Sequence, residues 1–229
     1  MLYSIILGTE MTAQEAVIYF LITIFVFMIS LTIHEFAHAF TAVKMGDDTP
    51  KLSGRLTLNP FKHIDMSGFL CFIFLGVGWA KPVPVNPLNF KKYRTGSRLV
   101  SIAGILANFL LGLLAAIIYA ILLATVTVES VAMTYVYIIL EYTMIINSML
   151  ALFNLLPIYP LDGFMFITSF MKTENKFIKY NLRHGYSILF GVLIVNMLIE
   201  IMFGIGIIDI YLNLLYYFVY LPICAIGVL

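Results

Sequence analysis

Three residues within one apolar stretch have the types and the spacing of a metal site. His34, Glu35 and His38 form the pattern His-Glu-x-x-His inside a long hydrophobic run. On an α-helix, residues four apart share a face and lie about 6 Å from each other, so both imidazoles can reach one ion. The glutamate lies on the flank of that face. There it can contact a water on the metal without being a ligand.

The apolar surroundings of these residues strengthen the prediction of a metal. Two histidines and a carboxylate in a hydrophobic helix are unfavourable unless they are paired or bound to an ion. A satisfied polar cluster and a proton relay are the alternatives. We prefer metal binding to both.

A catalytic zinc site needs a third protein ligand and keeps its fourth position for water. The candidate is Asp162, which follows two prolines in the segment Asn-Leu-Leu-Pro-Ile-Tyr-Pro-Leu-Asp that starts at Asn154. The prolines exclude a regular helix, and broken backbone at membrane depth is tolerated only where it is buried in protein or lines a cavity. An ordinary turn at Asp162 and Gly163 explains the same residues, so local sequence leaves both interpretations open.

The elements that must position these residues are membrane helices. Of the 229 residues, 62% are hydrophobic and 11% charged, whereas soluble domains carry about 25% charged residues. Five apolar runs exceed or approach the roughly 20 residues that cross a bilayer. They cover residues 16–43, 99–128, 131–156, 185–203 and 205–221.

These runs predict an all-α polytopic membrane protein. We expect residues 1–229 to form a single membrane-embedded domain, with a core at about 16–170 and additional helices at about 185–221. The histidine pair then lies in the first helix, and Asp162 follows the third. A net charge of +1 gives no reason to expect a nucleic acid partner.

The distribution of charge predicts the orientation in the membrane. All 13 basic residues fall within the segments 44–62, 81–98 and 172–183. With five crossings these segments face one side, which is the cytoplasm by the positive-inside rule. We therefore expect a multi-pass protein of the cell membrane with its N-terminus outside and its active site opening to the cytoplasmic side.

Residues 66–80 are apolar but too short for a confident span. If they crossed, the second basic segment would face the compartment opposite to the first, and the charge bias would largely vanish. We therefore prefer a re-entrant segment or a β-hairpin near the cytoplasmic side.

Three motifs in this order resemble the site-2 protease family of intramembrane zinc metalloproteases. That family combines HExxH on one transmembrane helix with NxxPxxxLDG on another, and both patterns are complete here, at 34–38 and 154–163. Between them, residues 78–87 read GWAKPVPVNP, which resembles a signature of the compact prokaryotic branch without PDZ or CBS domains. The resemblance covers roughly residues 16–170.

The resemblance implies His34, His38 and Asp162 as ligands of one Zn²⁺ per chain and Glu35 as the catalytic glutamate. Asn154 would correspond to the family's asparagine near the active site, although a helix-end cap or an interhelical bond explains it equally well. The implied activity is endopeptidase hydrolysis in or near a transmembrane segment of another membrane protein, as in regulated intramembrane proteolysis. The implied partners are this transmembrane substrate and the lipid bilayer.

Two positions depart from the family pattern. Residues 103–108 read AGILAN, where Ile105 replaces the proline of the family's AGPxxN element, and Met66 stands where relatives often have proline. Both leave the zinc residues untouched but affect the expected path of residues 63–80.

The chief alternative function is an ion or metal transporter that uses intramembrane His, Glu and Asp. A transporter predicts polar residues spread along several helices, whereas here they concentrate at one depth.

Overall fold

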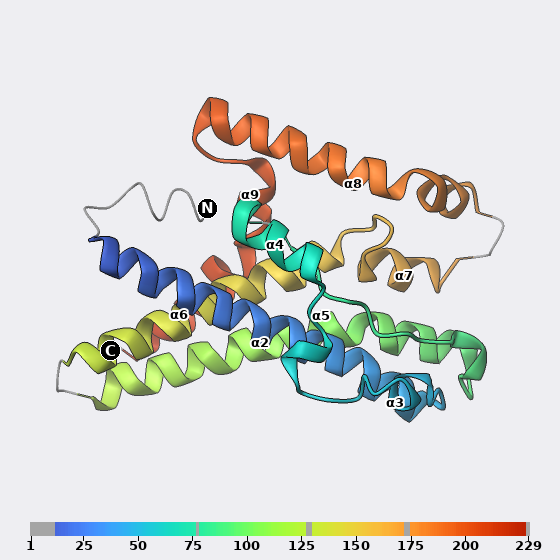
Figure 1. Ribbon diagram of the computed structural model, residues 1–229, viewed down its shortest axis with the longest axis horizontal. Coiled ribbons are helices and arrows are strands. Elements are labelled where there is room, and N and C mark those ends of the chain that lie inside the picture. Colours follow the sequence, from blue (N-terminus) through green and yellow to red (C-terminus); the bar gives the residue numbers. More distant parts are fainter. Residues whose placement is uncertain (1–11, 77, 127–129, 172–174, 228–229) are drawn as a thin grey trace.

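The computed structural model describes residues 12–76, 78–126, 130–171 and 175–227, and these residues form a helical protein in which no strand is assigned (Figure 1). Five helices are long and apolar enough to cross a membrane. This confirms the predicted fold class. The five are α2 (Ala13–Met45), α5 (Tyr93–Thr125), α6 (Val131–Leu155), α8 (Lys176–Phe203) and the span Ile207–Ile226, which comprises α9 (Ile207–Leu212), the π-helical η3 (Tyr216–Tyr220) and α10 (Leu221–Ile226).

Two helices begin earlier than the apolar runs predict. α5 starts at Tyr93 instead of residue 99, and α8 starts at Lys176 instead of residue 185. Hydropathy marks the part of a helix that matches the hydrocarbon, whereas the backbone hydrogen bonds continue into the polar region. Basic residues near the starts of α5 and α8 are therefore helical.

The core of the molecule is a bundle of α2, α5 and α6, in which α5 packs against both neighbours (Figure 1). α2 and α6 run in one direction and α5 returns between them. The C-terminal span closes one side of α5. There the fully buried Tyr220 donates a hydrogen bond to Phe109 O at 3.0 Å, and its ring lies where a side chain at Gly112 would project.

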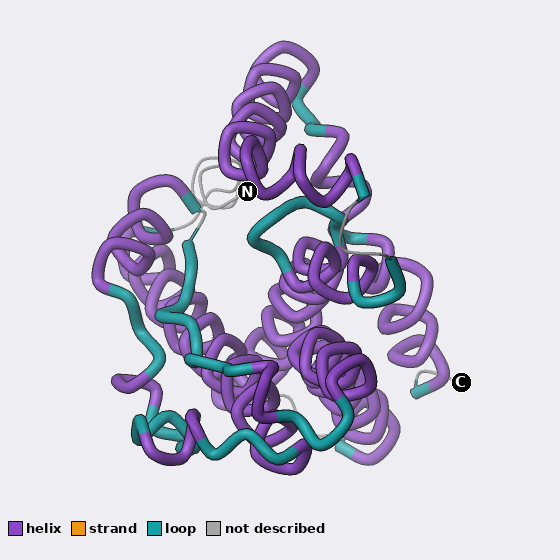
Figure 2. The backbone as a smooth tube through the Cα atoms, turned by 90° about the vertical axis from the view of Figure 1, so that its right-hand side faces the viewer, coloured by secondary structure: helices purple, strands orange, loops and turns teal. Residues whose placement is uncertain are grey.

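α8 lies apart from this bundle (Figures 1 and 2). None of the residues in its most apolar stretch is buried within the protein. Contacts near its middle and in its last third hold it. Tyr186 meets the ring of Tyr159 edge to face, and Asn196 accepts a hydrogen bond from the backbone N–H of Ile208 at 2.8 Å.

The short apolar segment forms α4 (Met66–Leu75), a helix of 10 residues. At 1.5 Å per residue it rises about 15 Å, half of the roughly 30 Å hydrocarbon core. Its flanks meet again, because Ile64 and Ala80 form an antiparallel bridge and Lys81 donates its N–H to His63 O at 2.8 Å. The chain thus leaves and returns at one place, a path that agrees with the predicted re-entrant segment. In place of a β-hairpin, the described residues form this isolated bridge.

The chain then follows α2 as an extended segment, residues 79–91, which includes the single 3-10 turn η2 (Pro87–Asn89). Three backbone N–H groups of this segment bond to α2 or to the residues just after it. The pairs are Val83 to Glu35 Oε2 at 2.9 Å, Asn86 to Asp47 Oδ2 at 2.7 Å and Lys91 to Met45 O at 2.9 Å. The 79–91 segment thus covers the flank of the HExxH helix. Viewed along the long helices, Figure 2 shows loops gathered at the end where α2 stops and α5 begins.

Candidate metal centre

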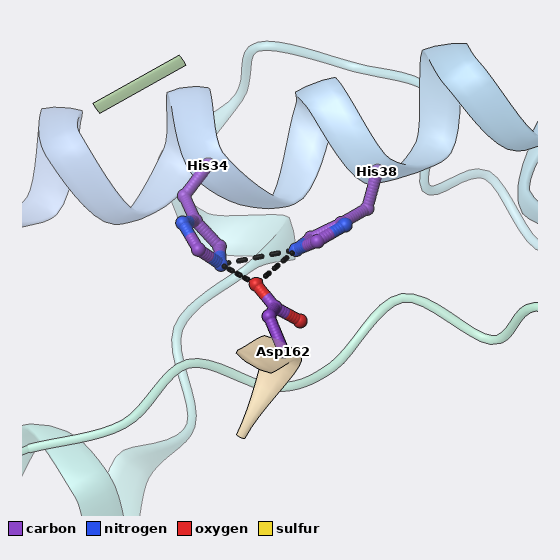
Figure 3. A group of neighbouring side chains, drawn as sticks. All are labelled: His34, His38 and Asp162. Carbon is purple, nitrogen blue, oxygen red and sulfur yellow. Dashed lines mark hydrogen bonds and ion pairs between the residues drawn. The ribbon is translucent and has the colours of Figure 1, made fainter. Parts of the chain in front are cut away.

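The two histidines and the aspartate converge on one point between α2 and α7 (Asp162–Thr168) (Figure 3). Asp162 Oδ2 lies 3.1 Å from His34 Nε2 and 3.0 Å from His38 Nε2. The two Nε2 atoms lie 3.0 Å from each other. The structure therefore brings together the three residues that the sequence proposes as ligands.

Hydrogen bonds on the far side of each imidazole determine which nitrogen faces this point. His38 Nδ1 lies 2.8 Å from the carbonyl oxygen of Val100, and His34 Nδ1 lies 2.6 Å from Asn108 Oδ1. Both partners accept, so each neutral imidazole carries its proton on Nδ1 and directs the lone pair of Nε2 inward.

Asn108 is itself held in one orientation. Its Nδ2 donates to Asn147 Oδ1 at 2.7 Å and to Ser30 O at 3.2 Å, which leaves Oδ1 for His34. Asn147 in turn donates to Ser30 Oγ at 2.9 Å. Asn108, Asn147 and Ser30 are all fully buried. This network connects α2, α5 and α6 and fixes the ring of His34.

The donor set fits a metal ion. Three lone-pair-bearing atoms face each other, and Asp162 Oδ2 is buried without a hydrogen-bond donor in the described residues. Such a cluster is unfavourable unless a cation lies among its atoms. Zinc bonds of about 2.0–2.1 Å in tetrahedral geometry separate ligand atoms by about 3.3 Å. The observed separations of 3.0–3.1 Å come within a few tenths of an ångström of that value.

Asp162 is placed by close packing of α7 on the end of α6. A Cβ at Gly163 would meet the backbone of Leu155 and Leu156, so only glycine allows this approach. Phe164 is buried beside it. The ionised form of this carboxyl is the one that binds metals.

Gly104 of α5 forms another wall of the site. A Cβ built there would lie 2.6 Å from His34 Nε2 and still closer to His38 Nε2. α5 can approach the two imidazoles because this residue has no side chain.

Glu35 does not belong to the group of three. Its Oε2 accepts the backbone N–H of Val83 at 2.9 Å, so the carboxylate points along the flank of α2 towards the 79–91 segment. This position agrees with a role beside the metal rather than as a ligand.

The other polar candidates have partners of their own. Asn154 donates from Nδ2 to Leu150 O at 2.9 Å, within its own helix. The buried His63 bonds through Nε2 to Thr57 O at 2.8 Å, and His184 packs against the ring of Tyr180. Both histidines lie outside the group of three.

Sequence comparison identifies the family. The chain matches peptidase family M50 over residues 22–138 and 121–198. The chain belongs to peptidase family M50. The resemblance to the site-2 proteases is thereby confirmed.

Curated relatives of this M50 chain include YwhC of Bacillus subtilis (strain 168), named as a candidate zinc metalloprotease. It is 44% identical over 144 residues, which are 61% of this chain and 64% of YwhC. Rip2 of Mycobacterium tuberculosis, named in the same way, is 29% identical over 161 residues, which are 69% of this chain and 60% of Rip2. The M50 chain therefore spans less than two thirds of the length of either relative. No solved structure gives a significant match.

Proposed function

We propose that this chain is a zinc-dependent intramembrane endopeptidase that hydrolyses a peptide bond in or near a transmembrane segment of another membrane protein. The observation that carries the proposal is the convergence of His34 Nε2, His38 Nε2 and Asp162 Oδ2 at a buried junction between helices. Membership of the M50 family supports the same chemistry. The three residues are the proposed ligands of one Zn²⁺.

Zinc at this position would polarise the scissile carbonyl and lower the pKa of a water to about 7. Glu35 accepts a proton from the attacking water as the carbon–oxygen bond forms. It delivers that proton to the amide nitrogen as the carbon–nitrogen bond breaks. Because Val83 N–H bonds to Glu35, the 79–91 segment orients this carboxylate. Asn108 and the carbonyl of Val100 hold the imidazoles in the required tautomer.

Asn154 remains the proposed residue for a hydrogen bond to the substrate or to the developing oxyanion. Its Nδ2 is engaged with Leu150 O, which leaves Oδ1 to accept from a substrate N–H. The extended backbone of residues 79–86 offers further hydrogen-bonding groups to an unwound substrate.

For the orientation, we propose an external N-terminus and an active site open to the cytoplasm. The end of α2 and the starts of α5 and α8, which carry basic residues, lie at the same end of the molecule (Figure 1), and the positive-inside rule assigns that end to the cytoplasm. Lys172, in the third basic segment, lies outside the described residues. Single cysteines at positions 51 and 91, in a variant without Cys71 and Cys224, should be labelled from the same side. Labelling from opposite sides would contradict this topology.

A transporter is not favoured. Its polar groups would be distributed along a path, whereas the inward-facing atoms here meet at one point and their far sides are saturated by hydrogen bonds.

The substitution Glu35→Gln tests the proposed function. It removes the base but leaves the three ligands, so the variant should retain zinc and lose proteolysis. Membrane proteomes are compared between cells that carry the wild type and cells that carry the variant, to find a single-pass protein that accumulates uncleaved with the variant. That protein is then used as the substrate in a cleavage assay with each purified protein. Equal cleavage by the two purified proteins would contradict the mechanism.

A further inference from the structure

Three basic side chains converge on a cavity beside the re-entrant segment. The cavity has a volume of about 430 Å³, and its lining includes Arg55, Lys62 and Lys81 together with Ser53 and Phe61. None of its lining residues is acidic. Its size is that of a small-molecule site and its charge suits an anion.

Arg55 sets the geometry of the cavity. Its Nη1 donates to the carbonyl oxygens of Lys62 and Lys81, the second at 3.4 Å, and so connects the two segments that carry the lysines. A guanidinium has five N–H donors, so further donors remain for an anion. Neither lysine ammonium forms an ion pair with any carboxylate in the part of the chain that the structure describes.

Two acidic residues near in sequence, Asp65 and Asp47, are engaged elsewhere. Asp65 accepts from the N–H groups of Ser67 and Gly68, both at 3.0 Å, as the N-cap of α4. Asp47 is fully buried and holds the 79–91 segment through Asn86. The positive charge of the cavity is therefore not neutralised by these neighbours.

The three basic residues of the cavity belong to segments 44–62 and 81–98, which we expect to face the cytoplasmic headgroups. Ser53 and Arg55 lie in the chain that follows the end of α2 at Met45.

Large apolar side chains project from the same segment. Leu52, Leu58 and Phe61 are 85%, 60% and 79% exposed. Apolar side chains interleaved with basic ones are typical of segments that rest in the membrane interface. Binding of a free phosphate from water would not explain these exposed apolar side chains.

We propose that this cavity binds the anionic headgroup of a phospholipid. Arg55, Lys62 and Lys81 hold the phosphate, and Leu58 and Phe61 contact the acyl chains. The site does not depend on peptidase activity. Since Lys81 and Val83 belong to one extended segment, the lipid also restrains the backbone that bonds to Glu35.

Trp79 provides the measurement. It is the single tryptophan of the chain, it is 44% exposed, and it lies two residues before Lys81. The full chain in detergent micelles is titrated with brominated phosphatidylglycerol or brominated phosphatidylcholine, which quench a nearby indole. Because each basic residue contributes several-fold to binding an anionic lipid, phosphatidylglycerol should reach half-quenching at a mole fraction about tenfold lower.

A matched pair of variants tests the assignment. Lys62→Gln with Lys81→Gln should reduce the preference for phosphatidylglycerol below about twofold. Lys176→Gln with Lys179→Gln removes the same charge from the exposed start of α8 and should leave the preference unchanged. Arg55 stays in place in both variants, so the packing between the two segments is retained.

Equal quenching by the two lipids, or equal loss in both variants, would overturn the proposal. Millimolar glycerol 3-phosphate and a soluble acidic peptide are added as competitors, and neither should displace phosphatidylglycerol. Displacement by glycerol 3-phosphate would reassign the cavity to a free phosphate, and displacement by the peptide would reassign it to protein.

Discussion

His34 Nδ1 lies 2.6 Å from Asn108 Oδ1, across the interface between α2 and α5. This contact fixes both the rotation of the imidazole and the position of its proton. The inward lone pair of His34 therefore depends on a residue that contacts no reacting atom. Asn108 is a positioning residue.

Asn108→Ala should weaken zinc binding about 10- to 100-fold, the usual effect of removing a hydrogen-bond partner of a metal-bound histidine. Competition with a chromophoric chelator measures the dissociation constant. Ser97→Ala, near the start of the same helix, removes only a bond to the helix's own backbone and is the control. An unchanged zinc affinity in Asn108→Ala would show that the tautomer of His34 is fixed in another way.

Asp162 and Asn154 come from the same motif but should behave differently. Asp162→Ala removes the anionic ligand, and an uncompensated dication in buried surroundings binds weakly, so both zinc and activity should be lost. Asn154→Ala should keep stoichiometric zinc and lose only rate or substrate binding, because its amide bonds to Leu150 O. Metal analysis of both purified variants decides this. Tightly bound zinc in Asp162→Ala would mean that another residue is the third ligand.

The sequence predicted the parts of the site that depend on local spacing. The separation of His34 and His38 places them on one helical face, and the five apolar runs locate the helices. Asp162 was reached through its motif. The alternative of an ordinary turn could not be rejected until the packing of α7 on α6 was known.

The supports of the imidazoles could not be predicted in the same way. Val100 contributes a backbone carbonyl, which every residue possesses, and its role depends on how closely α5 approaches α2. Asn108 could be noticed in the sequence only as an amide side chain in an apolar helix, at the end of the AGILAN element that resembles the family's AGPxxN. Asn147 is buried in the bundle and accepts from Asn108, a pairing that depends on how α5 packs against α6. The contact of Val83 with Glu35 left no pattern in the sequence.

Asp47 anchors the 79–91 segment from beyond the end of α2. Its carboxylate accepts from Thr49 N at 3.1 Å, Asn86 N at 2.7 Å and Asn89 Nδ2 at 2.8 Å. Asp47→Ala removes these hydrogen bonds to a buried carboxylate, and a hydrogen bond to a charged group contributes about 1.5–3 kcal/mol. Hydrogen exchange of residues 83–91 should therefore accelerate. The exposed neighbour Asp48 makes no side-chain capping bond, so Asp48→Ala is the control.

The same anchor predicts how the segment responds to pH. Burial raises the pKa of Asp47, but the hydrogen bonds from Thr49, Asn86 and Asn89 lower it further, so the folded pKa lies below its ordinary value. Such a group contributes its full stability above the unfolded pKa of about 3.9 and loses it as the pH falls through the folded value. After correction for intrinsic exchange rates, protection of residues 83–91 should be constant from about pH 8 to 5. Loss of protection between about pH 8 and 5, in the wild type but not in Asp47→Ala, would contradict a folded pKa of Asp47 below its ordinary value.

Gly104 gives the most direct test that the space between the imidazoles is functional. A methyl group there would lie 2.6 Å from His34 Nε2, which is closer than real Cβ atoms approach, and α5 cannot retreat without disturbing the bond between Asn108 and His34. Gly104→Ala should therefore lower zinc occupancy and proteolysis together, although alanine favours a helix over glycine by about 1 kcal/mol. Gly191→Ala, in α8 with no atom within 4 Å of the added methyl, should change neither. Zinc content and cleavage are measured on both proteins at a temperature at which thermal melting shows both to be folded. Full zinc occupancy in Gly104→Ala would show that the metal does not lie between His34, His38 and α5.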